Sequence, residues 1–287
     1  NYLFDTLYHD IFQVNGGTLY EGLVETGSNR AEEPDPLHPE IISRLSNRYK
    51  YNKISEDYYG SEDCGGVHLK RMLYWYRQYF KNTAAGASIL VPIGALRAIH
   101  RLCKFSGNRA IFISGDKGNN NPDQFSGLMD PHIAVHGSFS LMVNYHAISQ
   151  FFSSCGGFTL NNPQEEASLK VSTFVMMPSE RDMHVREKWN VETPVRLSEE
   201  RAKCFPYLSR SFQDSMESFG PNDFFVLQKS LKEDSSEPSL RAVIVLLKLG
   251  DWDPDVFFKF RDTLLNQAPQ AGPKLRNDIV RGLPRVW

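Results

Sequence analysis

The chain has 287 residues and a formal net charge of −2, with 41% hydrophobic and 23% charged residues. This balance is that of an ordinary globular protein, and it excludes disordered, collagen-like and coiled-coil chains. A nearly neutral chain has no strong overall field that would attract nucleic acid or an anionic membrane, so neither is an expected partner. At this length we expect one large domain, or one domain with an appendage.

The spacing of the cysteines and the length of the apolar runs indicate which cellular compartment suits the chain and whether it crosses a membrane. The chain contains no C-x-x-C pair, and its widely spaced cysteines are Cys64, Cys103, Cys155 and Cys204. Such spacing predicts reduced thiols in the cytoplasm or another reducing compartment. The longest apolar run covers 242–247, whereas a membrane helix needs about 20 residues, so we predict no membrane span. Because both ends are apolar and the first residue is not Met, we interpret the chain as a piece of a longer protein.

The first part of the chain predicts strands and loops. Residues 1–14 fit the end of a strand, a turn and an apolar stretch, and Gly16-Gly17 favours a hairpin turn into a strand at 18–26. Three prolines make 33–39 a loop, while 40–48 fits a short helix. We expect 49–66 to be irregular.

Residues 67–82 are predicted to form a helix with one apolar face, made of Leu69, Met72, Leu73, Tyr76, Tyr79 and Phe80. Its aromatic side chains suit a platform for stacking nucleic-acid bases, or a helix that packs on a sheet. We favour the packed helix, because aromatic stripes usually fill cores.

The middle of the chain alternates helix and strand. Pro92 suits the first turn of a helix over 93–103, and the apolar run within 109–114 suits a buried parallel strand followed by a polar loop over 114–123. A helix over 140–154, capped by Ser138 or Ser140, comes next. Residues 158–160 and 169–177 alternate as an antiparallel edge pair of strands.

The last third of the chain changes character. Residues 179–198 are charged and irregular, and 199–220 are moderately helical. Short helices then follow one another at 223–232, at 239–249, from 253 and from 274. We therefore expect an α/β domain over 1–178, a linker over 179–220, and the start of a helical repeat or bundle over 221–287.

Two carboxylates lie at the ends of predicted strands. Asp5 follows a strand-like segment, and Asp116 follows the apolar strand of 109–114. Ligands of open α/β sheets bind at the carboxyl ends of the strands, so the two carboxylates would face one pocket if their strands were neighbours. Alternatively, each side chain caps its own turn.

One pair of histidines has the spacing of metal ligands on a helix. His132 and His136 are four residues apart, but Pro131 and Gly137 flank them, which suits a strand or loop better. No third ligand is evident, so we predict no metal site.

Three short segments resemble MidA-type methyltransferases, which depend on S-adenosyl-L-methionine (SAM). The first is 1–24, where NYLFDTL leads to Phe12 and then YEGLV; the second is AIFISGDKG at 110–118; the third is SFSLMVNY at 138–145. In that family these segments follow the fourth strand of the sheet, form its fifth strand, and start the next helix. Tyr2 stands where the family has Glu, and Lys117 replaces a Tyr.

The resemblance implies a fold and a function for residues 1–177. The fold is α/β, the C-terminal part of a class I (Rossmann-like) methyltransferase sheet, followed by an all-α helical-repeat-like tail. The implied activity is SAM-dependent methylation of a protein arginine or another nitrogen. Most SAM contacts are expected upstream of Asn1, so no cofactor-binding residue is identified.

The roles follow from what methyl transfer requires. A protonated nitrogen has no free lone pair and cannot attack a methyl group, and nearby carboxylates can orient it or accept the proton. We expect Asp5 and Asp116 to be catalytic and Asn1, Ser138, Asn144 and Tyr145 to contact the substrate. Two other hypotheses stay open. One is a non-catalytic assembly protein built on a degenerate methyltransferase core, and the other is an unrelated α/β enzyme.

Overall fold

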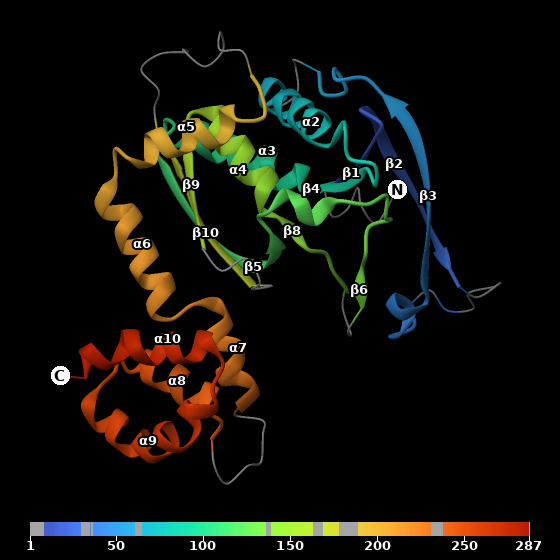
Figure 1. Ribbon diagram of the computed structural model, residues 1–287. Coiled ribbons are helices and arrows are strands. Elements are labelled where there is room, and N and C mark those ends of the chain that lie inside the picture. The colour runs from blue at the N-terminus through green and yellow to red at the C-terminus, as the bar shows by residue number, and fades with distance from the viewer. Residues whose placement is uncertain are drawn as a thin grey trace. The chain divides into compact units, whose positions relative to one another are not determined.

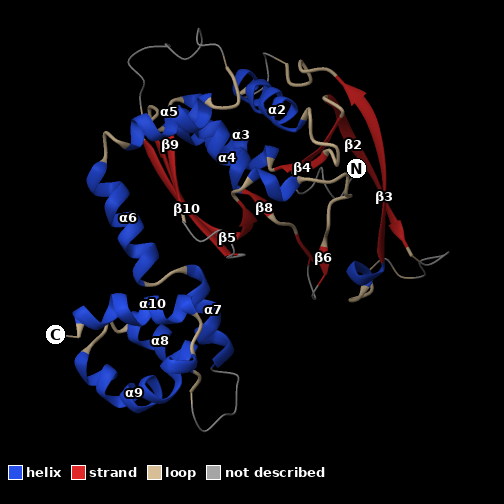
Figure 2. Cartoon of the chain, in the orientation of Figure 1, coloured by secondary structure: helices blue, strands red, loops and turns tan. Residues whose placement is uncertain are grey.

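The computed structural model describes residues 9–29, 35, 37–60, 65–135, 139–162, 169–177, 189–230 and 238–286. The architecture is mixed α/β with a helical C-terminal region (Figures 1 and 2). The chain forms two compact units. Unit 1 comprises Asn1–Asn161 and Ser172–Cys204, and unit 2 comprises Asn162–Val171 and Phe205–Trp287.

The first sheet of unit 1 is an antiparallel arrangement in the order β3-β2-β1-β4. Its strands are β1 (Asp10–Asn15), β2 (Thr18–Ser28), β3 (Leu45–Ile54) and β4 (Ala87–Val91). The predicted hairpin turn is confirmed: Gly16 and Gly17 have φ values of 53° and 73°, in the left-handed region that favours glycine. The strand that we predicted at 18–26 is β2.

The helix predicted over 40–48 is wrong. Only Ile41–Arg44 is helical, as the short 3₁₀ helix η1, and β3 begins at Leu45. The strand pairs with β2 along its whole length, from Ser28 opposite Leu45 to Leu19 opposite Ile54. Residues 49–54, which we expected to belong to an irregular segment over 49–66, are therefore part of this strand. Tertiary pairing has overridden a weak local preference for helix.

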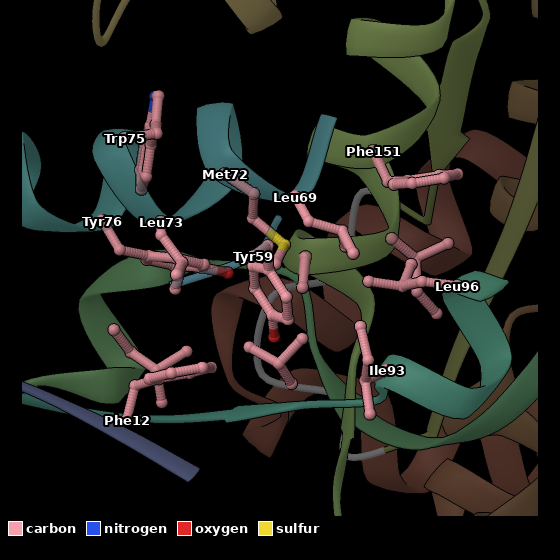
Figure 3. Packing of buried hydrophobic residues seen from close by; sticks show 14 of the residues in the cluster. Phe12, Tyr59, Leu69, Met72, Leu73, Trp75, Tyr76, Ile93, Leu96 and Phe151 are labelled. Atoms are coloured by element: carbon pink, nitrogen blue, oxygen red, sulfur yellow. The ribbon is translucent and has the colours of Figure 1, made fainter. Parts of the chain in front are cut away.

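Two helices that the sequence predicted are confirmed, α2 (Gly66–Phe80) and α3 (Ile93–Phe105). The apolar face of α2 enters the main core of unit 1, where it meets Phe12 of β1 and Ile93 and Leu96 of α3 (Figure 3). Trp75 and Tyr76 are only 2% and 0% exposed. The interpretation of these aromatic side chains as core residues is therefore confirmed.

The second sheet of unit 1 has the order β8-β5-β10-β9. Its strands are β5 (Ala110–Asn119), β8 (Val143–Asn144), β9 (Phe158–Asn161) and β10 (Leu169–Met176). The antiparallel pair of β9 and β10 confirms the prediction for 158–177. A separate pair of short strands joins β6 (Ala134–Val135) to β7 (Phe139–Ser140).

Strand β5 differs from the prediction in two ways. It continues to Asn119, so Asp116 and Gly118 lie in the strand and the loop predicted over 114–123 is wrong there. Gly118 pairs with Val143, and a Cβ at Gly118 would collide with the Val143 carbonyl oxygen. The strand is also not buried on both faces, because Ile111 and Ile113 are 61% and 76% exposed.

Helix α4 (Tyr145–Cys155) begins later than we predicted. Its N-cap is Asn144, whose side-chain oxygen accepts a hydrogen bond from the Ala147 amide at 2.8 Å. The prediction of Ser140 as the cap is wrong, because Phe139–Ser140 is the strand β7. Ser138 lies outside the described residues. The remaining helices in the described part of unit 1 are the 3₁₀ helix η2 (Pro122–Phe125) and α5 (Thr193–Ala202).

The described part of unit 2 from residue 205 onward is helical, as predicted. Its elements are α6 (Pro206–Ser218), α7 (Pro221–Ser230), α8 (Leu240–Leu249), α9 (Pro254–Gln267), η4 (Ala268–Gln270), α10 (Pro273–Gly282) and η5 (Leu283–Arg285). The predicted N-cap Asp253 is confirmed, since its Oδ1 accepts from the Asp255 and Val256 amides. Trp252 and apolar side chains of α8, α9 and α10 form a separate core. None of the helices in the described ranges is long and apolar enough to cross a membrane.

Candidate ligand-binding site

Unit 1 contains a pocket of about 690 Å³ between its helices and the second sheet. Helices α2, α4 and α5 line it, together with β9 and the segment that follows β5. Asn120 and Pro122 represent that segment, so one wall of the pocket lies just beyond the carboxyl end of β5. This is where open α/β sheets commonly bind ligands.

Asn144 fixes the helix that forms the base of the pocket. Its amide caps α4, and its Nδ2 donates to the Leu90 carbonyl oxygen of β4 at 3.1 Å. Gly156 ends the helix with a φ of 100°, a left-handed conformation that glycine adopts without strain. The register of α4 is therefore set at both ends, which fixes the side chains that it directs into the pocket.

A buried hydrogen-bond chain links α2 to α4. The Tyr76 hydroxyl lies 3.4 Å from Asn144 Oδ1 and 2.9 Å from His146 Nδ1. On the other side of the ring, Gln150 Nε2 lies 3.3 Å from His146 Nε2. With Gln150 as the donor, His146 Nε2 accepts and the imidazole proton is on Nδ1. Burial lowers the pKa of His146 to about 3, so the ring is neutral at physiological pH.

Two polar atoms of the pocket lining have no hydrogen-bond partner among the described residues. They are Gln150 Oε1 and Thr159 Oγ1, and both are shielded from water. Gln150 as a whole is only 3% exposed. Buried polar atoms without partners are rare in folded proteins, because each costs about 1–3 kcal/mol. Because neither oxygen is accessible to water, neither opens into the pocket.

An aromatic pair forms another wall. The rings of Trp75 and Tyr79 stack at 4.6 Å with an angle of 14°. The Trp75 indole donates to the Val191 carbonyl oxygen at 2.7 Å, and the Tyr79 hydroxyl donates to Asp123 at 2.7 Å. These bonds attach the segment before α5, and η2, to helix α2. Val191 is also part of the pocket lining.

The rim of the pocket is charged and exposed. Glu192 and Glu199 contribute two carboxylates, and Arg196 contributes one guanidinium. Arg196 already donates to Glu200 at 2.9 Å, which offsets its charge. The remaining charge at the rim is therefore negative, which favours a cation at the entrance.

The structure places the predicted site residues apart from this pocket. Asp5, Asn1 and Ser138 lie outside the described residues. Asp116 is exposed, and its Oδ1 accepts a hydrogen bond from the Lys117 amide at 2.7 Å. That bond is to the adjacent residue, and Asp116 lies within strand β5 rather than in a turn.

Asn144 and Tyr145 lie in the interior of unit 1, with exposed fractions of 3% and 0%. The Tyr145 hydroxyl lies 2.9 Å from Ser114 Oγ, and its ring stacks on Phe174. Neither residue lines the pocket described above. Asn144 acts on the pocket indirectly, because it caps α4 and contacts Tyr76.

Sequence reasoning missed His146, Gln150 and Thr159. His146 and Gln150 are four residues apart and therefore share one face of α4. That spacing is a usable signal, but apolar side chains surround both residues in the sequence, and a polar pair on a buried face is also typical of core packing. Thr159 gives no signal, because a threonine in a short strand is ordinary.

The turn between β4 and α3 lacks the features of a SAM site. Cofactor sites in open α/β sheets use a glycine-rich turn between a strand and a helix, where backbone amides hold the ligand. Here Pro92 alone connects β4 to α3, and proline has no amide hydrogen to donate. The Asp116 carboxylate already bonds the neighbouring Lys117 amide.

The described residues do not form a cluster of metal ligands. Within the described ranges, no three side chains of His, Cys, Asp or Glu are arranged to hold a metal ion. His132 is described, whereas His136 falls outside the described ranges. The described cysteines, Cys103, Cys155 and Cys204, are free thiols.

Comparison of the chain with family models, curated proteins and solved structures gives no significant match.

Proposed function

We propose that unit 1 is part of a SAM-dependent methyltransferase and that its pocket holds the methyl acceptor, a protein arginine or another nitrogen group. The observation that carries this proposal is the position of the pocket, beyond the carboxyl end of β5 and against the first turns of α4. Strand β5 contains one of the three segments that resemble MidA-type methyltransferases, and another of them ends at Tyr145, the first residue of α4. The acceptor would therefore lie next to the resembling segments.

The second sheet is compatible with the α/β domain that the resemblance implies. Its strand β10 lies between β5 and β9 and runs antiparallel to β9.

The residues of this chain would bind and orient the acceptor rather than the cofactor. SAM supplies the methyl group when it is bound, and its contacts are proposed to lie outside the described residues. The acceptor would lie among the side chains that line the pocket, and the aromatic pair of Trp75 and Tyr79 would exclude water on one side. Positioning of this kind contributes much of the rate in group transfer.

The test is a methyl-transfer assay on the full-length protein, with tritium-labelled SAM and arginine- or lysine-containing peptides as acceptors. We expect labelled peptide, and we expect Gln150→Leu to lower the rate more than tenfold. Gln213→Leu is the matched control, because Gln213 is exposed on α6 in unit 2. Absence of transfer to every acceptor by a folded, SAM-bound protein would refute the proposal, as would full activity in Gln150→Leu.

One observation favours the second candidate function, a non-catalytic assembly protein. Asp116, one of the two predicted catalytic carboxylates, points its Oδ1 at its neighbour's amide and lines no pocket described for unit 1. On that hypothesis the helices of unit 2 bind a protein partner. Asp116→Asn separates the two functions, because it should lower methyl transfer only if Asp116 is catalytic.

A further inference from the structure

The charges of the chain are unevenly distributed along the sequence. Residues 64–115 contain eight Lys and Arg residues and no Asp or Glu. The net charge of −2 conceals this basic block, because the balancing carboxylates lie in other parts of the chain. A local excess of positive charge attracts an anionic partner even when the chain as a whole is nearly neutral.

Some of this positive charge is compensated inside unit 1. The Lys70 ammonium group lies 2.8 Å from the Asp57 carboxylate, and the Arg77 guanidinium pairs with Glu56. All four residues lie on α2 or on the segment that precedes it. The basic side chains of α2 that form these pairs are therefore not available to a partner at full charge.

Three basic side chains at the end of α3 keep their full charge. Arg101, Lys104 and Arg109 are exposed, and none of them forms an ion pair with another described residue. Arg101 and Lys104 are three residues apart, so they are neighbours on one face of the helix. Arg109 follows the turn that ends the helix. These cations face solvent and are available to an anionic surface.

Two large apolar side chains lie among these cations. Phe105, the last residue of α3, is 92% exposed, and Leu102 is 53% exposed. The other side of the helix carries Leu96 and Cys103, which are buried in the main core of unit 1. The packing of α3 therefore does not need Phe105 or Leu102. Adjacent apolar side chains that stay in water are typical of a contact surface.

Hydrogen bonds of the following turn hold Phe105 in place. The Asn108 amide donates to the Cys103 carbonyl oxygen at 2.7 Å, and the Gly107 amide donates to that of Lys104 at 3.2 Å. Gly107 and Asn108 have φ values of 63° and 58°, the left-handed conformation that commonly ends a helix. The exposed phenyl ring is therefore presented by a hydrogen-bonded helix end.

We propose that the end of α3 is a docking surface for an anionic lipid bilayer. This surface, the α3 tip, consists of Arg101, Leu102, Lys104, Phe105 and Arg109. Phe105 and Leu102 enter the boundary between the headgroups and the acyl chains, while the three cations contact anionic headgroups. Phe or Leu together with Lys and Arg is the combination with which peripheral proteins bind membranes. The proposal goes beyond methyl transfer and does not depend on it.

The apolar side chains favour a bilayer over nucleic acid as the partner. Proteins that bind nucleic acid combine cations with polar side chains that reach base edges, or with several aromatic rings on which bases stack. The α3 tip offers one phenyl ring and the aliphatic Leu102. An aliphatic side chain cannot form a hydrogen bond with a base, whereas the acyl region of a bilayer accepts both side chains.

The experiment is co-sedimentation of the full chain with two kinds of vesicle, phosphatidylcholine alone and phosphatidylcholine with about 30% phosphatidylserine. We expect binding to the anionic vesicles to be at least tenfold tighter, and to weaken as salt is added. Equal binding to the two kinds of vesicle would overturn the proposal, as would no binding to anionic vesicles. Tighter binding to a single-stranded RNA than to anionic vesicles would show that the bilayer is the wrong partner.

A substitution of the phenyl ring tests the apolar contact. Phe105→Ser should weaken binding to anionic vesicles at least fivefold. Phe258→Ser is the matched control, because Phe258 is 62% exposed on α9 in unit 2 and should bind as the wild type does. Equal binding by the two variants would place the contact elsewhere and overturn the proposal.

A charge reversal tests the electrostatic contact. Lys104→Glu should weaken binding to anionic vesicles at least fivefold, since each basic residue near an anionic surface contributes about that factor. Lys259→Glu is the control, the same change at an exposed position of α9. Unchanged vesicle binding by a folded Lys104→Glu variant would contradict the proposal. If a variant does not fold, the wild-type comparison of the two kinds of vesicle decides.

Discussion

The hydroxyl of Tyr76 lies 2.9 Å from Nδ1 of His146, and this contact joins α2 to α4 at the base of the pocket. Both residues are buried, with exposed fractions of 0% and 8%. Each ring nitrogen of His146 therefore has a partner, Tyr76 on one side and Gln150 on the other. Burial keeps the imidazole neutral, and these two contacts hold its ring between α2 and Gln150.

Removing the Tyr76 hydroxyl should destabilise unit 1. Tyr76→Phe leaves His146 Nδ1 buried without a partner and removes a contact to Asn144, so we expect a loss of about 1–3 kcal/mol in the free energy of unfolding. Urea denaturation, monitored by circular dichroism, measures this loss of free energy. Tyr207→Phe is the control, because Tyr207 is 88% exposed and should change stability by less than about 0.5 kcal/mol. Equal losses of stability in the two variants would contradict the buried hydrogen bonds of Tyr76.

Stability should fall as the pH is lowered through the range where unfolded histidine titrates. Burial lowers the pKa of His146 to about 3 and that of His68 to about 4, against 6.5 for the unfolded chain. Below pH 6.5 the unfolded state therefore binds more protons than the folded state, which favours unfolding. Each of the two residues contributes about 1.4 kcal/mol per pH unit in this window.

Urea denaturation at several pH values between 7 and 5 checks this, with His146→Gln as the comparison. The variant should lose less stability per pH unit than the wild type, by about the contribution of one histidine. An NMR titration of His146 with a midpoint near 6.5 would show that the ring is not buried as described.

In unit 2, Gly282 should tolerate no side chain. A Cβ at this position would overlap the indole of Trp252, which is only 3% exposed in the helical core. Gly282→Ala should therefore cost about 1–3 kcal/mol, the usual cost of overpacking. Gly272→Ala is the matched control, since a Cβ there would meet nothing within 4 Å. Thermal denaturation compares the melting temperatures of the two variants. Equal melting temperatures would contradict the packing of Trp252 against Gly282.

The outer face of β5 should tolerate charge. Ile113 is 76% exposed, whereas Ile89 of β4 is 1% exposed. We expect Ile113→Lys to leave the free energy of unfolding within about 0.5 kcal/mol and to raise solubility, because it interrupts an exposed apolar strand. Ile89→Lys should prevent folding or cost several kcal/mol, because it buries an unpaired charge. A strongly destabilised Ile113→Lys variant would show that another part of the protein covers this face.

Local patterns predicted much of the fold. The helical spacing of Leu69, Met72 and Tyr76 predicted α2, and Pro254 after the cap Asp253 predicted the start of α9. The strand β3 could not be predicted in this way, because its stability comes from pairing with β2, which is remote in sequence. Gly118 was misleading for a related reason: it permits a close approach to Val143 rather than a turn.

The candidate site was much less accessible to sequence reasoning. The prediction concentrated on carboxylates at strand ends, and Asp116 does follow the apolar core of β5. Hydrogen bonding decides what such a carboxylate can do, and Asp116 engages the adjacent amide. The pocket is instead lined by neutral polar groups, among them Gln150 and Thr159. That lining exists only once α4, α5 and β9 are assembled.

The most direct measurement of the central claim is methyl transfer by the full-length protein from tritium-labelled SAM to arginine- or lysine-containing peptides. The account predicts labelled peptide, and a lower rate when the pocket-lining Gln150 is replaced by Leu. Unlabelled peptide in the presence of a folded, SAM-bound protein would contradict it.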